Sequence, residues 1–116
     1  MGLELTDAAF VRIVEEELDA LPDEMVEGLQ NVAFVVEDAP ADGEDLFGRY
    51  DGVDLTRRGR YGFGELPDRI VLFRRAHLAS ADTVEALRHQ VRTTLVHEIG
   101  HYYGLDDERL HTLGWA

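Results

Sequence analysis

A histidine, a glutamate and a second histidine near the end of the sequence have the types and spacing of a metal site. His97 and His101 are four residues apart. In a helix they project about 40° from each other on one face, close enough for both imidazoles to reach one ion. Glu98 lies beside the pair, where its carboxylate can reach a water molecule bound to that ion. Two neutral imidazoles and a neighbouring carboxylate base are the groups that zinc-assisted hydrolysis of an amide requires.

The residues after this motif could supply a third ligand. Gly104 is of the type that ends helices, and Asp107 follows at a distance from which its carboxylate can fold back toward the histidines. In a plainer interpretation, the histidines lie on a solvated helix face and Asp107 caps the next helix. That interpretation leaves the spacing unexplained. We therefore predict that His97, His101 and Asp107 bind one zinc ion tetrahedrally, with Glu98 as the catalytic base.

The other three histidines are weaker candidates. His89 precedes His97 by eight residues, which places it about 80° round the helix, so we expect it to miss the ion. His77 falls in a predicted loop between a strand and the motif helix, and we expect it to be solvated. His111 comes one turn after Asp107 and is the next candidate if that aspartate is not a ligand. Tyr103 and Tyr61 are both candidates for a hydroxyl group that stabilises an oxyanion.

The motif is predicted to lie on a long helix. Apolar side chains recur within it at helical spacing, which indicates a face packed against a core. Ser80 or Asp82 is the expected cap at the start of this helix, and Tyr103 lies near its end. Asp106 should then cap a last short helix over residues 106–113.

The preceding chain is predicted to form two more helices and a small sheet. Thr6 should cap a helix to residue 20, and Pro22 should start a short helix to residue 29. Short β-branched or apolar runs predict strands, and polar or glycine-rich stretches predict loops. The expected strands are 32–36, 49–55 and 70–73, with a polar loop over 38–48 and a turn over 56–65. This order predicts a single α+β domain over residues 1–116.

Composition excludes several classes of function. The 116 residues include no cysteine and no lysine, so disulfides, thiolate ligands and Schiff-base chemistry are excluded. The net charge is −13, and residues 1–54 contain 16 acidic residues against two arginines. We therefore expect no nucleic-acid partner. No apolar run is long enough for a membrane helix, and the acidic start is unlike a signal peptide, so we expect a cytoplasmic protein with no membrane partner.

Beyond the motif, the sequence resembles a known family. The pattern HExxHxxGxxD, from His97 to Asp107, is similar to the metzincin branch of zincin metallopeptidases, and the final aspartate resembles the snapalysin type. Over roughly residues 30–116 the sequence resembles more closely the small bacterial family of minimal zincin-like proteins, which are possible zinc metallopeptidases. The further segments that carry this resemblance are Tyr50-Asp51-Gly52-Val53, Leu66-Pro67-Asp68-Arg69-Ile70 and Asp107-Glu108-Arg109-Leu110-His111-Thr112-Leu113-Gly114-Trp115.

The resemblance implies a minimal zincin-like fold, in which a small mixed sheet packs against the helix carrying the motif. It also implies that His97, His101 and Asp107 bind zinc and that Glu98 is the general base. No methionine follows Met25, so the methionine turn of the metzincins is absent. We also expect no C-terminal subdomain of the kind that larger peptidases have.

Three functions are consistent with these observations. The first is a zinc-dependent metallopeptidase, in which a metal-activated water attacks the carbonyl group of a peptide or protein substrate. The second is a zincin-fold metal-binding or interaction module without efficient proteolysis. The third is a zinc hydrolase of a small non-peptide amide. Zinc content together with chelator-sensitive cleavage distinguishes the first two, and the sequence leaves the oligomeric state open.

Overall fold

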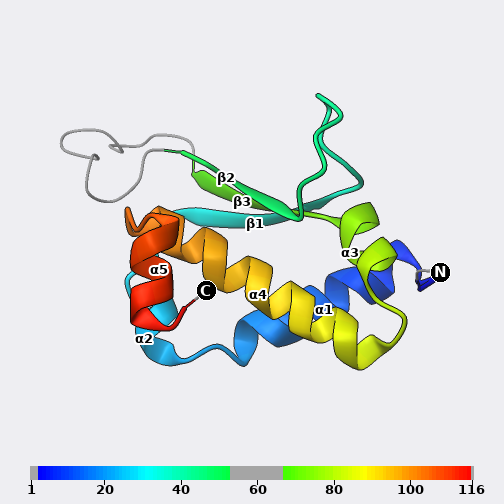
Figure 1. The fold of residues 1–116 in the computed structure, drawn as a ribbon, viewed down its shortest axis with the longest axis horizontal. Coiled ribbons are helices and arrows are strands. Elements are labelled where there is room, and N and C mark those ends of the chain that lie inside the picture. The colour runs from blue at the N-terminus through cyan, green and yellow to red at the C-terminus, as the bar shows by residue number, and fades with distance from the viewer. Residues whose placement is uncertain (1–2, 53–66, 116) are drawn as a thin grey trace.

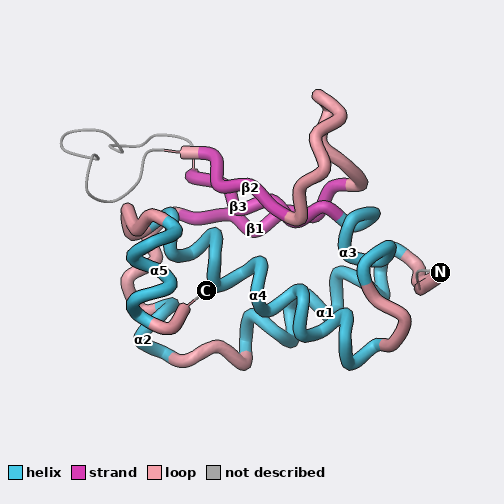
Figure 2. The backbone as a smooth tube through the Cα atoms, in the orientation of Figure 1, coloured by secondary structure: helices cyan, strands magenta, loops and turns pink. Residues whose placement is uncertain are grey.

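The structure is a computed structural model that describes residues 3–52 and 67–115. The described residues form five helices and three strands in an α+β arrangement (Figure 1 and Figure 2). In chain order these are α1 (Asp7–Asp19), α2 (Asp23–Val26), β1 (Val32–Glu37), β2 (Gly48–Asp51), β3 (Asp68–Phe73), α3 (Arg74–Ser80), α4 (Val84–Tyr102) and α5 (Asp107–Leu113).

The three strands form one mixed sheet in the order β1-β3-β2. β3 is central: it pairs in parallel with β1 and antiparallel with β2, so Ile70 lies between Phe34 and Tyr50. Residues 70–73 of β3 are buried, as expected for an apolar run in a central strand. β2 is therefore an edge strand of the described sheet.

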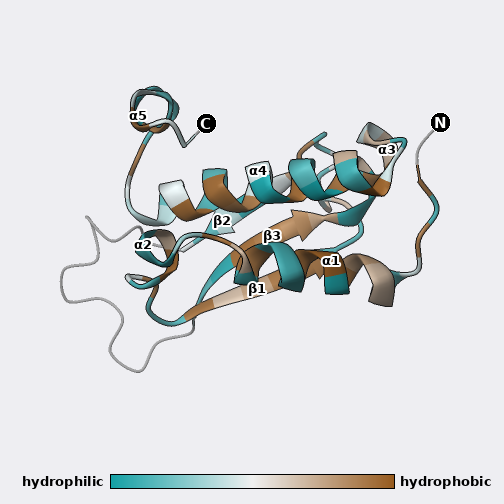
Figure 3. Cartoon of the chain, turned by 90° about the horizontal axis from the view of Figure 1, so that it is seen from below, coloured by the Kyte–Doolittle hydropathy of each residue, from teal (hydrophilic) through white to brown (hydrophobic). Residues whose placement is uncertain are grey.

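Helices α1 and α4 lie on the same side of the sheet, and α4 packs against β2 and β3 (Figure 1). Along α4 the buried residues Leu87, Val91, Leu95 and Ile99 recur every four residues, which is the apolar stripe of a core helix. Figure 3 shows that hydrophobic residues dominate β1 and β3, which face this stripe. The core is completed by residues of α1 and β3, namely Phe10, Ile13, Val14, Ile70 and Leu72.

A cluster of ion pairs also joins α1 to α4. Glu17 is buried, and its carboxylate oxygens lie 3.1 Å from Arg88 Nη1 and 2.9 Å from Arg92 Nη2. A buried carboxylate costs free energy unless it is paired and hydrogen-bonded. The two arginines, one turn apart on α4, therefore hold the motif helix in a defined orientation against α1.

Several sequence predictions about the elements are confirmed. Thr6 caps α1 by accepting a hydrogen bond from the amide of Ala9, and Asp106 caps α5 by accepting one from the amide of Arg109. The predicted strand 49–55 is present in part as β2, which ends at Asp51, so that Gly52 falls after its end. The remainder of that prediction from residue 53 on, and the predicted turn over 56–65, lie outside the described residues.

The prediction of a loop between the last strand and the motif helix is wrong, because α3 occupies residues 74–80. β3 runs into α3 without the glycine, proline or polar stretch that marks a boundary in a sequence. The cap of α4 also differs from the prediction: Thr83 accepts a hydrogen bond from the amide of Ala86, in place of Ser80 or Asp82. None of the helices in the described part of the chain has the length and apolar character that a membrane span requires.

Candidate metal centre

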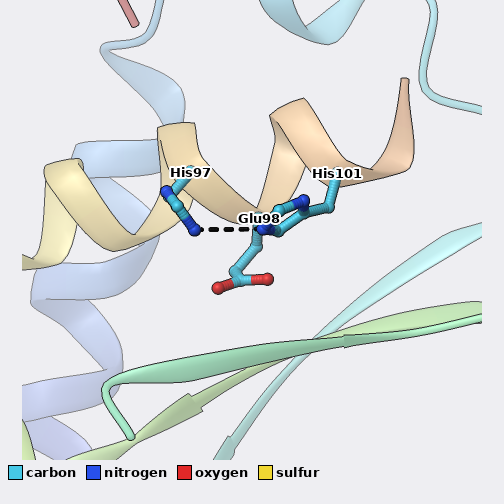
Figure 4. A group of neighbouring side chains, drawn as sticks. All are labelled: His97, Glu98 and His101. Carbon is cyan, nitrogen blue, oxygen red and sulfur yellow. Dashed lines mark hydrogen bonds between the residues drawn. The ribbon is translucent and has the colours of Figure 1, made fainter. Parts of the chain in front are cut away.

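The last two turns of α4 bring the two histidine side chains of the motif together (Figure 4). The Nε2 atoms of His97 and His101 lie 3.0 Å apart, and the rings meet edge to face with centroids 4.5 Å apart. Two nitrogens bound tetrahedrally to one zinc ion, each at about 2.05 Å, lie roughly 3.3 Å apart. The spacing of the pair therefore suits one ion.

Hydrogen bonding places a lone pair on Nε2 of His101, and burial favours the neutral form of His97. Nδ1 of His101 lies 3.1 Å from the carbonyl oxygen of Leu105. Because a carbonyl only accepts, Nδ1 carries the hydrogen, and Nε2 of the neutral ring has the lone pair. Burial lowers the pKa of His97, and His101 lowers it further against the opposing effect of Asp107. His97 is thus biased toward the neutral form that binds metals.

Glu98 points from α4 toward the strands, beside the two histidines (Figure 4). It is buried, and a carboxylate oxygen of Glu98 and one nitrogen from each of His97 and His101 all lie within 4.8 Å of one another. Burial is the main cause that raises the pKa of Glu98; His101 opposes it, while Asp107 and Asp51 add to it. A carboxyl group with a raised pKa is suited to taking up a proton and returning it.

The turn after α4 brings Asp107 back to the histidines. Gly104 has a φ of 82°, the left-handed conformation that glycine adopts readily at the end of a helix. Asp107 then opens α5, with Oδ1 3.4 Å from Nε2 of His97 and 3.8 Å from Nε2 of His101. The three atoms form a triangle with sides of 3.0 to 3.8 Å, which is the size of one face of a zinc tetrahedron. The donor set present therefore fits a single zinc ion.

The position of Asp107 depends on how α5 packs against α4. Leu110 of α5 is fully buried, and it lies directly over Gly100. A Cβ atom at Gly100 would be 2.2 Å from Cδ2 of Leu110. Glycine at this position of the motif helix therefore permits the close approach of α5 that carries Asp107 toward the histidines.

β2 and α4 form the two walls of a cleft at this site. At Gly48 the backbone of β2 passes so close to α4 that a Cβ atom there would lie 2.6 Å from Cγ2 of Thr94. A hollow of about 470 Å³ lies beside His101 and is lined in part by Tyr50, Leu105 and Glu98. A second, more apolar hollow of about 280 Å³ lies beside the site and is lined in part by Leu46 and Phe47. Glu98 borders both hollows.

Comparison with known proteins identifies the family of this chain. A profile described as zincin-like metallopeptidase matches residues 29–115. The chain belongs to this family. Among solved structures, a conserved hypothetical protein from Thermus thermophilus is similar over 94% of this chain and 97% of its own chain, with 27% sequence identity and a TM-score of 0.58. No curated protein matches the sequence.

Tyr50 lies at the cleft of this zincin-like chain, and the sequence predicted no role for it or for its partner Asp68. Tyr50 lines the larger hollow, and its hydroxyl group donates a hydrogen bond of 2.6 Å to Oδ2 of the buried Asp68. The two residues are 18 positions apart on antiparallel strands. No local spacing signals such a pair; only the register of β2 on β3 brings it together.

Among the described residues, the other candidates from the sequence are not part of the group formed by His97, Glu98 and His101. The hydroxyl group of Tyr103 donates to the carbonyl oxygen of Met25 at 2.8 Å, which directs it toward α2, and Tyr61 lies outside the described residues. His89 and His111 are exposed. His77, which was expected to be solvated, is fully buried, because α3 folds it back against α4.

Proposed function

We propose that this zincin-like protein is a zinc-dependent metallopeptidase that hydrolyses peptide bonds in a peptide or protein substrate. Its family supports zinc as the ion. The observation that carries the proposal is the grouping of Glu98 with His97 and His101 at the wall of a cleft. A carboxylate base beside the metal ligands is what metal-assisted hydrolysis needs and what simple metal binding does not.

In this proposal His97, His101 and Asp107 hold one zinc ion, which supplies Lewis-acid polarisation of the substrate carbonyl and lowers the pKa of water. Glu98 takes a proton from the attacking water and passes it to the leaving amine. Burial, which raises the pKa of this carboxyl group, supports the role, because Glu98 then holds the proton until the amine accepts it.

The edge strand β2 is suited to binding an extended substrate. Of the described strands it pairs with β3 alone, so its outer edge can accept a peptide as an added strand. Gly48 and Tyr50 of β2 border the two hollows that share Glu98. A peptide laid along β2 would therefore pass over the proposed base.

The test is the Glu98→Gln variant, which nearly preserves the shape of the side chain but cannot act as a base. We expect full zinc content and a loss of cleavage of about 10²–10⁴-fold, the usual effect of removing a general base. Zinc content and cleavage of an unfolded protein should be measured on the same sample. Glu85→Gln, an exposed glutamate in the first turn of the same helix, is the matched control and should behave like the wild type.

The other outcomes decide against the proposal. Cleavage that survives in Glu98→Gln would point to a contaminating protease. Zinc-loaded wild type that cleaves none of a diverse set of unfolded substrates would favour the metal-binding or interaction module.

A further inference from the structure

His77 is a buried titratable residue with no role in the proposed hydrolysis. It lies on α3 with no exposed surface, between the rings of Phe10 and Phe47, whose centroids are 5.6 Å and 5.2 Å from its own. Both ring nitrogens have partners: Nδ1 lies 2.8 Å from the carbonyl oxygen of Phe73, and Nε2 lies 2.9 Å from the hydroxyl oxygen of Thr94. Thr94 is on the motif helix, one turn before Glu98.

The hydrogen-bond chemistry defines which group donates to which. The carbonyl of Phe73 only accepts, so Nδ1 carries the hydrogen. Burial lowers the pKa of His77, against the opposing effect of the Phe73 bond, so the ring is neutral and Nε2 is an acceptor. The hydroxyl of Thr94 must then donate to Nε2.

The Thr94 hydroxyl has a second acceptor within reach, the carbonyl oxygen of Gln90 at 3.0 Å. The carbonyl oxygen of Gln90 already accepts a hydrogen bond from the helix amide four residues later. Without the Thr94 hydroxyl, Nε2 of His77 would be buried with no donor. A buried polar atom without a partner costs about 1–3 kcal/mol. The single hydroxyl hydrogen of Thr94 therefore goes to His77.

This bond sets the orientation of the Thr94 side chain, and that side chain contacts β2. With the hydroxyl turned to His77, the methyl group faces Gly48, where a Cβ atom would lie 2.6 Å from Thr94 Cγ2 and 3.4 Å from Glu98 Cγ. The same histidine contacts Phe47, whose carbonyl oxygen accepts a hydrogen bond from the amide of Phe73. His77 thus contacts both sides of the cleft: α4 through Thr94, and the residue that precedes β2, Phe47.

We propose that His77 is a positioning residue, which through Thr94 and Phe47 sets the separation of β2 and α4 at Glu98. The proposal rests on the proposed peptidase function, since the cleft so defined is where the substrate and Glu98 meet. Its effect is on geometry: the hydrogen bond between His77 and Thr94 keeps the start of β2 packed against the motif helix.

The test compares two substitutions of one residue. Thr94→Val keeps the methyl group that faces Gly48 and replaces the hydroxyl with a second methyl, whereas Thr94→Ser keeps the hydroxyl and removes the methyl. We expect Thr94→Val to lower kcat by about 10- to 100-fold, the cost of a small misplacement of reacting groups, with zinc content unchanged. Thr94→Ser should restore most of the rate. Thr112→Val removes an exposed helix hydroxyl on α5 that bonds the carbonyl four residues earlier, and it should resemble the wild type.

A second readout does not depend on cleavage. Long-range proton–nitrogen spectra of the wild type should show His77 protonated on Nδ1 alone. In Thr94→Val the amides of Gly48 to Asp51 should shift and exchange hydrogen faster with solvent, and in Thr94→Ser they should stay close to wild type. If wild type does not cleave, the peptidase proposal fails, and these amides still decide the role of His77.

Unchanged β2 amides in Thr94→Val, or equal effects of Val and Ser, would overturn the proposal. If Thr94→Val does not fold, His77→Phe takes its place, since it keeps a ring between Phe10 and Phe47 while removing both hydrogen bonds. It is then expected to show the same loosening of β2 with retained zinc.

Discussion

At the scale of single residues, burial changes the proton affinity of three side chains at or near the cleft. It raises the pKa of Glu98 and lowers the pKa values of His97 and His77. Each shift favours the uncharged form, because a charged group loses hydration on burial. The uncharged form is the one that His97 needs to bind a metal, and the one in which His77 accepts a hydrogen bond from Thr94.

The proposed third ligand is tested by Asp107→Ala. Loss of a residue that only hydrogen-bonds a metal ligand typically weakens metal binding by about 10- to 100-fold. Asp107 is proposed as a direct ligand, so we expect its loss to lower zinc affinity by at least about 100-fold. Competition with a fluorescent chelator measures it. Glu108→Ala removes the next carboxylate of the same helix turn and should leave the affinity unchanged. If Asp107→Ala binds zinc as tightly as the wild type, Asp107 is not the third ligand, and His111 is the next candidate.

The buried neutral state of His77 predicts a loss of stability in mild acid. Its folded-state pKa lies below the ordinary value of 6.5. As the pH falls below 6.5, the unfolded chain binds a proton that the folded chain does not, so the free energy of unfolding decreases until the lowered pKa is reached. Urea unfolding at pH 7.5 and 5.5 should show a larger decrease for wild type than for His77→Phe. Equal decreases would mean that His77 takes up its proton in the folded state.

At the scale of elements, two close approaches determine the shape of the site. Gly48 lets β2 lie on α4 beside Glu98, and Gly100 lets α5 lie on α4 so that Asp107 reaches the histidines. In neither place would a Cβ atom fit without movement of its neighbours. The two glycines thus bring a strand and a helix onto the same turns of α4.

The role of the second approach is tested by Gly100→Ala. Inside a helix this change ordinarily stabilises by about 0.5–1 kcal/mol. Here the new Cβ would meet Leu110 Cδ2 at 2.2 Å, so we expect α5 to be displaced and zinc affinity to fall, although Gly100 offers no ligand. Adding Leu110→Ala makes room and should recover part of the affinity. Zinc affinity that is undiminished in Gly100→Ala would show that Asp107 does not depend on this contact.

At the scale of the whole molecule, the apolar core lies beside the candidate metal ligands and does not include them. The described helices and strands enclose an apolar core formed by α1, β3 and α4, whereas the candidate ligands His97 and His101 are only partly buried and lie beside it. The protein should therefore differ from a zinc finger, in which the metal supplies the folding free energy.

We accordingly expect the chain to stay folded in a chelator and to melt at a higher temperature with zinc. Free zinc at 100 times its Kd stabilises by about 2.7 kcal/mol, which for a domain of this size raises Tm by roughly 10 °C. Circular dichroism with EDTA, and then with excess zinc, measures both. If the protein unfolds when EDTA is added, the ion has a structural role.

The sequence by itself determined the features that depend on neighbours within about four residues. The spacing of His97, Glu98 and His101 predicted their common place on one helix, and Thr6 and Asp106 predicted helix starts, all of which the structure shows. Helix geometry and capping are local, so a short pattern is enough to specify them. The recurrence of apolar residues predicted in the same way which face of α4 would be buried.

Only the tertiary structure decided what faces the motif. Three contacts join residues that are 17 to 46 positions apart. They are the hydrogen bond of Tyr50 to Asp68, the close approach of Gly48 to Thr94 and the hydrogen bond between the buried His77 and Thr94. Such contacts depend on strand register and on how α3 and β2 pack against α4, and no periodicity in one segment encodes them. The position of Asp107 depends on both local spacing and tertiary packing. Its spacing from the histidines suggested a ligand, and the packing of α5 on Gly100 brings its carboxylate to the histidines.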